Sequence, residues 1–207
     1  MTEIRRTDFI PAMGKRWLLP LYDPFSRFWG VRRVHEQLLD HADIQRGQRV
    51  LEIGCGTGNL LTALGRRLPD VEALGIDPDP GALRIARRKA ARAKLPVRYE
   101  RAFAGELPVP DASFDHVLSS FMLHHLDDDE RGRALREVRR VLRPGGRLHV
   151  VDADASVPGG HRNHPRLAHS TPERVLAALT DAGLTDAVRT GRGNGRFGAV
   201  AFYRAEG

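Results

Sequence analysis

The sequence predicts one α/β domain built on a mostly parallel sheet. From residue 49 onward, apolar runs suited to buried strands alternate with helical patterns in five β/α units. Two further apolar stretches, at 185–190 and 198–204, flank a glycine-rich turn over 191–198 and indicate a hairpin. A hairpin after parallel units adds one antiparallel strand. We therefore expect a sheet with helices on both faces and a single antiparallel strand.

The order of the elements follows from the spacing of apolar residues. Strands are expected at 49–53, 71–76, 97–101, 115–119 and 147–151, and helices at 58–68, 82–93, 128–142 and 172–182. Pro144-Gly145-Gly146 should end the third of these helices, because proline and glycine do not continue one. Thr171 and Pro172 suit the cap and first residue of the last helix.

Composition narrows the class of protein. The 207 residues are 41% hydrophobic and 29% charged, with a net charge of +7, which suits a water-soluble domain. A net positive charge can attract an anionic partner such as nucleic acid. The arginines are scattered and the sequence shows no nucleic-acid-binding motif, so we interpret them as a solvated basic surface. The single Cys55 fits a reducing compartment, and no run approaches the roughly 20 apolar residues of a membrane span. We expect a cytoplasmic protein.

Residues 1–46 are expected to form an N-terminal helical appendage to the domain at 47–207. The appendage is rich in aromatic residues, and residues 25–39 show a helical pattern. Its aromatics could simply dock it onto the core, or it could be a lid that closes a ligand pocket with Tyr22 facing the ligand. A third possibility is peripheral contact with an anionic membrane through its basic residues. The sequence leaves the three open.

The most informative stretch runs from Val50 to Leu60, where an apolar strand pattern ends in Gly54, Gly56 and Gly58 and a helical pattern follows. Strand, glycine turn and helix present backbone N–H groups and a helix N-terminus to an anionic ligand group. Glycine allows the backbone to approach the ligand closely. This pattern predicts a pocket for a nucleotide-type cofactor.

An acid at the end of the second strand fits a ribose. Asp77 lies 19 residues beyond Gly58, and a carboxylate there can accept hydrogen bonds from both ribose hydroxyls. Asp79 is the better cap for the next helix, which leaves Asp77 for the ligand. The glycine spacing differs from the dinucleotide pattern, and Glu52 would be poorly placed against a pyrophosphate. These features favour S-adenosylmethionine over NAD.

Four stretches carry a family resemblance: VLEIGCGTGNL (50–60), GIDPDPGAL (75–83), LPVPDASFDHVLSSFMLHHL (107–126) and EVRRVLRPGGRL (137–148). Over about residues 47–152 the chain resembles the class I S-adenosylmethionine-dependent methyltransferases. It is most similar to the group around the ubiquinone/menaquinone C-methyltransferases. The resemblance implies a single Rossmann-like domain with a seven-stranded sheet, six strands parallel and one antiparallel. It also implies S-adenosylmethionine as cofactor and S-adenosylhomocysteine as product.

The resemblance also implies which residues hold the cofactor. The glycine loop would hold the methionine part with Glu52 nearby, Asp77 the ribose, and Pro78 the adenine face. Ala104 would offer its backbone to the adenine edge, and the end of the fourth strand would lie beside the methionine. The expected cofactor-binding residues are Tyr22, Glu52, Gly54, Cys55, Gly56, Thr57, Gly58, Asp77, Pro78, Phe103, Ala104, Ser119 and Ser120.

One residue departs from the family pattern. Relatives usually carry Asp or Asn before the alanine, to accept a hydrogen bond from the adenine amino group, whereas this chain has Phe103. An aromatic ring can stack on the adenine but cannot accept that bond. The resemblance therefore implies weaker cofactor binding, by roughly 1 kcal/mol for one net hydrogen bond.

His124 and His125 follow the fourth strand and are the candidates for a general base or for positioning the acceptor. They could equally be packing residues beside the cofactor. The acidic run 127–130 suits a solvated helix start better than a metal site. Three loop histidines could border the acceptor site, and we expect no metal there; they are His161, His164 and His169.

These observations predict a methyltransferase that acts on a small-molecule acceptor, possibly apolar or aromatic, by in-line displacement at the sulfonium. One alternative is a non-catalytic module that binds S-adenosylmethionine, and a less favoured one is an NAD-dependent oxidoreductase. A nucleic-acid amino-methyltransferase is disfavoured because Ser119-Ser120-Phe121-Met122 stands where an Asp/Asn-Pro-Pro-aromatic run would be. The sequence does not indicate which atom is methylated or the oligomeric state.

Overall fold

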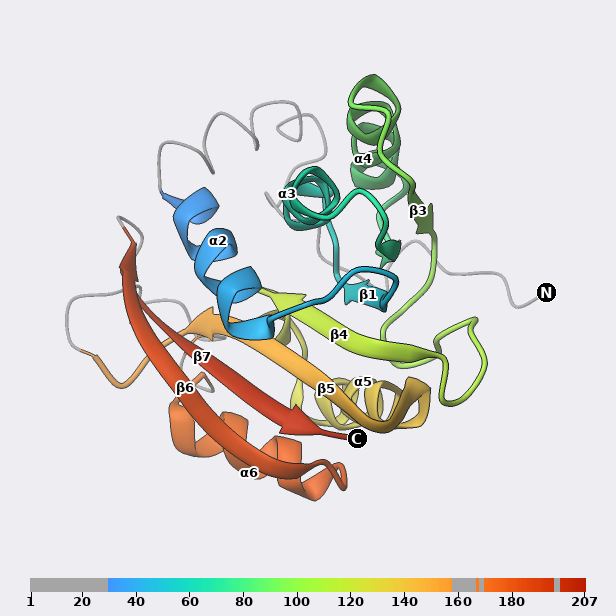
Figure 1. Cartoon of the computed structure of the whole chain (residues 1–207). Helices are drawn as coiled ribbons and strands as arrows, with labels where there is room; N and C mark the ends of the chain where they lie inside the picture. Colours follow the sequence, from blue (N-terminus) through green and yellow to red (C-terminus); the bar gives the residue numbers. More distant parts are fainter. Residues whose placement is uncertain (1–29, 158–166, 168–169, 196–197) are drawn as a thin grey trace.

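Seven strands form one mixed sheet in the order β3-β2-β1-β4-β5-β7-β6 (Figure 1). The computed structural model describes residues 30–157, 167, 170–195 and 198–207. The strands are β1 (Arg49–Ile53), β2 (Glu72–Ile76), β3 (Val97–Glu100), β4 (Phe114–Ser120), β5 (Leu142–Ala153), β6 (Thr185–Gly195) and β7 (Gly198–Glu206). β7 runs antiparallel to both of its neighbours, and all other pairs are parallel. The predicted fold class is confirmed, including the single antiparallel strand.

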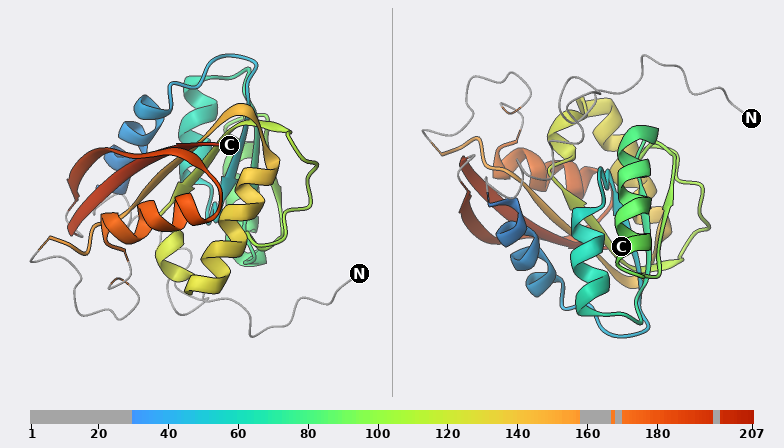
Figure 2. Two further views of the ribbon diagram at one scale, coloured as in Figure 1. Left: turned by 90° about the horizontal axis from the view of Figure 1, so that it is seen from below. Right: turned by 90° about the horizontal axis from the view of Figure 1, so that it is seen from above.

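The helices lie on both faces of the sheet (Figures 1 and 2). One face carries α2 (Val31–Ala42), α3 (Asn59–Arg67) and α4 (Pro80–Arg92), and the other carries α5 (Asp128–Val141) and α6 (Pro172–Asp181). A short 3-10 helix, η2 (Leu123–His125), follows β4. A parallel sheet covered on both faces needs apolar residues pointing both ways, which is why its strands are nearly continuous apolar runs.

Each face of the sheet therefore has its own core. Neighbouring residues of β4 divide between the two, because Val117 packs with α5 and α6 while Leu118 packs with the helices of the opposite face. Val34, Leu38 and Leu39 of α2 belong to the second core, so this helix of the predicted appendage packs directly on the sheet. Residues 1–29, and with them Tyr22 and the lid hypothesis, lie outside the described residues.

Side-chain caps set the starts of three helices. Asp79 caps α4 by accepting from the backbone N–H of Gly81, and Thr171 caps α6. Asp127 and Glu130 form a reciprocal capping box at the start of α5. The expected roles of Asp79, Thr171 and the acidic run 127–130 as helix starts are confirmed.

Two predicted boundaries are wrong. The strand expected at 147–151 already begins at Leu142, which pairs with Phe114 of β4, and it ends at Ala153, so Pro144-Gly145-Gly146 lies inside β5 and the preceding helix ends at Val141. The glycine-rich stretch 191–195 belongs to β6 instead of the hairpin turn. β6 is an edge strand with two irregular steps in its register, and such strands tolerate glycine.

The loop between β3 and β4 is fastened to α5 by one arginine. Arg140 donates to the carbonyl oxygens of Leu107 and Val109, at 3.0 and 2.9 Å, and pairs with Glu137 of its own helix. The Glu137 carboxylate in turn accepts from the backbone N–H of Leu107 at 2.7 Å. A charged donor thus binds two carbonyl groups of the loop.

We expect Arg140→Met to lower the free energy of unfolding by about 2 kcal/mol, because charge-assisted hydrogen bonds to two carbonyls are lost while Glu137 stays in place. Arg136 lies one turn earlier and is exposed, so Arg136→Met is a matched control that should change stability by less than about 0.5 kcal/mol. Urea unfolding measures both. Equal effects of the two substitutions would contradict the role assigned to Arg140.

Candidate functional site

The carboxyl ends of three neighbouring strands meet at one edge of the sheet. Ile53 of β1 pairs with Ile76 of β2 on one side and with Ser119 of β4 on the other. The residues that follow these strands are therefore brought together at the point where strand order reverses. In open α/β sheets this point is where ligands bind. The predicted glycine loop, Asp77 and the end of β4 share this location.

The three glycines of the loop all have positive φ, but their surroundings differ. A Cβ on Gly54 would lie 2.2 Å from Cγ of Met122, and one on Gly58 would lie 2.5 Å from the Tyr99 hydroxyl. A Cβ on Gly56 would meet no atom of the described residues within 4 Å. Gly54 and Gly58 are thus needed for packing inside the protein, while Gly56 borders open space where a ligand can approach the backbone.

Asp77 fastens the loop to the end of β2. Its Oδ2 accepts from the backbone N–H of Gly56, and its Oδ1 accepts from that of Asp79, both at 2.8 Å. Each carboxylate oxygen has two lone pairs, so both can accept a further hydrogen bond from a ligand. The carboxylate is held in one orientation before any ligand arrives.

Two acids share this low-dielectric region. Burial raises the pKa of Asp77 to about 6, although its two backbone hydrogen bonds oppose the rise. Burial, and next the charge of Asp77, also raise the pKa of Glu52. Oε2 of Glu52 is buried without a hydrogen-bond partner among the described residues. A ligand that donates hydrogen bonds or carries positive charge would relieve both acids.

The remaining loop residues are buried. Cys55 packs in the core of the α3 face, and burial raises the pKa of its thiol, which leaves it a small neutral side chain. Thr57 accepts from Lys89 of α4 at 3.3 Å, and Lys89 also donates to Asn59 at 2.6 Å. The ammonium of Lys89 thus ties the loop and the first residue of α3 to α4.

At the end of β4, Ser119 is fully buried and its hydroxyl has no partner among the described residues. Ser120 is joined to His35 of α2, with 3.0 Å between Oγ and Nε2. Burial lowers the pKa of His35 to about 4, so its ring is neutral near pH 7. Sequence reasoning missed His35, because a lone histidine on a helix gives no signal of a partner 85 residues away.

The predicted adenine-side residues follow β2 and β3. Arg101 donates to the carbonyl oxygen of Pro78 at 3.0 Å, which joins the ends of the two strands. Phe103 and Ala104 are half-buried, and Ala104 packs against the core on the α5 face. The contact of these residues with an adenine stays a prediction.

His124 forms a buried pair with Asp152 at the end of β5. Nδ1 of His124 lies 2.5 Å from Oδ1 of Asp152, and Oδ2 accepts from the His124 backbone N–H at 3.1 Å. Burial opposes ionisation of Asp152, but His124 and these hydrogen bonds outweigh it and hold the pKa of Asp152 below its usual value. A carboxylate on Nδ1 fixes the tautomer, so Nε2 is the nitrogen that can take up a proton.

The two predicted histidines differ, because only His124 is paired with Asp152 in the described structure. His125 is exposed, with its ring 4.1 Å from that of His124. Sequence reasoning missed Asp152, although its place at the end of the fifth strand could have suggested it. Within the described ranges, no three His, Cys, Asp or Glu side chains are arranged to hold a metal. The predicted loop residues His161, His164 and His169 lie outside those ranges.

Comparison with known proteins agrees with this geometry. Residues 50–146 match the family model of a methyltransferase domain. This stretch of the chain is thus similar to a methyltransferase domain. The matched segment runs from β1 into β5 and includes the glycine loop, Asp77 and His124. The match agrees with the family resemblance that the sequence motifs carry.

Curated proteins that are similar to this chain have names that state the molecule methylated. The chain is 40% identical over 138 residues to the demethylmenaquinone methyltransferase of Thermus thermophilus, covering 65% of this chain and 62% of that protein. It is 38% identical over 122 residues to the 27-O-demethylrifamycin SV methyltransferase of Amycolatopsis mediterranei, covering 58% and 44%. The chain thus spans less than two thirds of the length of these relatives.

Among solved structures, a SAM-dependent methyltransferase from Aquifex aeolicus superposes with a TM-score of 0.74 at 20% identity, covering 92% of this chain and 97% of that one. At this identity the likeness shows the shared fold. No described helix of the present chain is long and apolar enough to cross a membrane.

The different surroundings of the glycines give a test. Gly54→Ala should lower the free energy of unfolding by about 3 kcal/mol, because the new methyl collides with the inner atoms of Met122 and the positive φ is strained. Gly56→Ala, the matched control, should cost only the strain, about 1 kcal/mol. Chemical denaturation of both variants measures the difference. A larger loss at Gly56 would contradict the packing described.

Proposed function

We propose that this chain transfers the methyl group of S-adenosylmethionine to a small-molecule acceptor, by in-line displacement at the sulfonium. The main support for the proposal is the hydrogen bond from the Gly56 backbone N–H to the Asp77 carboxylate, at the point where strand order reverses. It combines an oriented carboxylate for the ribose with an open glycine backbone beside it. S-adenosylhomocysteine is the product that leaves this site.

The residues divide the work of binding the donor. The loop from Gly54 to Gly58 would hold the methionine part, and buried Glu52 would face its positive charge. Asp77 would accept from the ribose hydroxyls, Pro78 and Phe103 would pack on the adenine, and the Ala104 backbone would meet its edge. Ser119, whose buried hydroxyl has no partner among the described residues, would lie near the methionine.

On the acceptor side, His124 would act as a general base that Asp152 orients. Methyl transfer to a hydroxyl or amine releases a proton, and a histidine held through Nδ1 can take it up on Nε2. The leaving group is good, so alignment of the acceptor with the sulfonium supplies much of the acceleration. His125, being exposed, has the lesser role.

The acceptor we propose is a small apolar or aromatic molecule, and two observations support it. The relatives' names give a demethylmenaquinone and a demethylrifamycin as the molecules methylated. Residues 1–46 are rich in aromatic side chains. A reducing compartment such as the cytoplasm suits the free, buried Cys55.

Donor binding should depend on pH through Asp77. The ribose hydroxyls donate to the ionised carboxylate, so affinity is lost as pH falls through about 6, where Asp77 takes up a proton. We expect the dissociation constant for S-adenosylmethionine to be roughly tenfold higher at pH 5 than at pH 7. Calorimetric titration at each pH measures it.

Asp77→Asn is the matched control, because the amide cannot ionise while Glu52 still titrates. The variant should bind the donor more weakly at pH 7 and show a flatter pH dependence. An unchanged affinity in the variant, or an equally steep pH dependence, would contradict the role of Asp77.

Methyl transfer itself is tested with methyl-labelled S-adenosylmethionine, the reduced form of demethylmenaquinone and a panel of phenols. We expect label in an organic product, with the rate lowered about 100-fold by His124→Gln and little changed by His125→Gln. Donor affinity should be the same in both variants. Donor binding with no transfer to any acceptor would favour the alternative, a non-catalytic module.

A further inference from the structure

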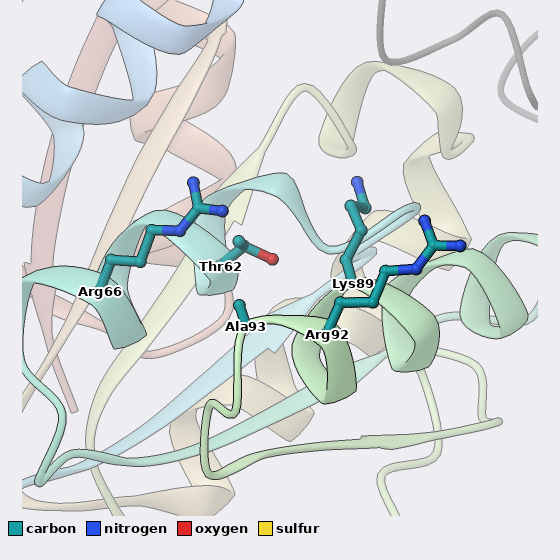
Figure 3. A pocket seen from close by; sticks show the side chains of 5 residues that line it. All are labelled: Thr62, Arg66, Lys89, Arg92 and Ala93. Carbon is teal, nitrogen blue, oxygen red and sulfur yellow. The ribbon is translucent and has the colours of Figure 1, made fainter.

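A basic cleft lies between α3 and α4 on the outer side of the sheet. It has a volume of about 230 Å³ and is lined by Thr62 and Arg66 of α3, and by Lys89, Arg92 and Ala93 at the end of α4. In Figure 3, Arg66 stands on one side, Lys89 and Arg92 stand on the other, and Thr62 and Ala93 lie between them. Three cations thus surround a small hollow.

Among the residues that the structure describes, no acidic one lines this cleft. The nine residues of α3 and the thirteen of α4 contain no Asp or Glu. Arg84, Arg88 and Arg92 follow one another at four-residue spacing and are all exposed, so one face of α4 presents a row of positive charge. Like charges at this spacing repel and slightly destabilise the helix. The helix dipole favours cations in the last turns of α3 and α4, where Arg66, Lys89 and Arg92 lie.

Two other exposed arginines form ion pairs, unlike the two arginines of the cleft. Arg67 lies 2.6 Å from Asp40, and Arg46 lies 3.2 Å from Asp70. In the part of the chain that the structure describes, Arg66 and Arg92 form no ion pair. Lys89 is held by Asn59 and Thr57, so its ammonium is oriented before a ligand binds.

We propose that this cleft binds the phosphate group of a small anionic ligand. Two guanidinium groups can each offer paired N–H donors to phosphate oxygens, and an ammonium adds a point charge. Lys89 also contacts Thr57 of the glycine loop, but Arg66 and Arg92 lie in the last turns of α3 and α4, so they test this inference separately from the proposed methyl transfer. Three of the positive charges behind the net charge of +7 would then serve to bind this ligand.

The cleft suits a small ligand better than a nucleic acid. Single-stranded nucleic acids are bound by stacking their bases on aromatic side chains along a basic groove, and no described aromatic residue lines this cleft. A membrane dock would combine basic residues with exposed apolar ones, and Val188 of β6 is the only exposed large apolar side chain among the described residues. The residues around the cleft therefore fit neither a nucleic-acid groove nor a membrane-binding surface.

The experiment is calorimetric titration of the full chain with inorganic phosphate and with pyrophosphate, at constant ionic strength and without methyl donor. We expect saturable binding, tighter for pyrophosphate, whose extra charge meets the same cations. Arg66→Gln and Arg92→Gln should each raise the dissociation constant about tenfold. Both side chains are exposed, so neither substitution threatens folding.

Arg136→Gln on α5 is the control, because it removes an exposed arginine on the opposite face of the sheet. It should leave phosphate binding unchanged. The proposal is overturned if neither anion binds saturably, or if the control weakens binding as much as the cleft variants do. It is also overturned if duplex DNA or phosphatidylglycerol vesicles bind through Arg66 and Arg92 while phosphate and pyrophosphate do not.

Discussion

The site depends on one buried carboxylate. Asp77 accepts from the backbone N–H groups of Gly56 and Asp79, so a single side chain joins the glycine loop after β1 to the start of α4. Burial of a carboxylate is costly, which is expressed in its pKa of about 6. The two backbone N–H groups only partly offset the cost of burying the charge of Asp77. A ligand with hydroxyl donors completes that compensation.

The residues that local patterns determine were predictable from the sequence. The glycines, Asp77 and the cap Asp79 follow from turn, strand-end and helix-start chemistry, which act within a few residues. The partners of predicted residues were not predictable. Asp152 pairs with His124 across 28 residues, and His35 reaches Ser120 across 85, so both contacts exist only once the sheet has formed.

The same limit explains the errors in boundaries. The Pro-Gly-Gly turn was expected to end a helix, but pairing of Leu142 with Phe114 ends it earlier at Val141. The glycines of residues 191–195 were expected to form a turn, but pairing with β7 extends them as an edge strand. In both cases a tertiary contact outweighs the local preference of proline or glycine. The overall topology survives such errors because the alternation of elements is strong.

The central claim is that the glycine loop and Asp77 form a site for S-adenosylmethionine. Its most direct test is calorimetric titration of the chain with S-adenosylmethionine and, separately, with NAD. We expect saturable binding of S-adenosylmethionine with one molecule per chain, competition by S-adenosylhomocysteine, and no binding of NAD. Binding of NAD alone would contradict the account.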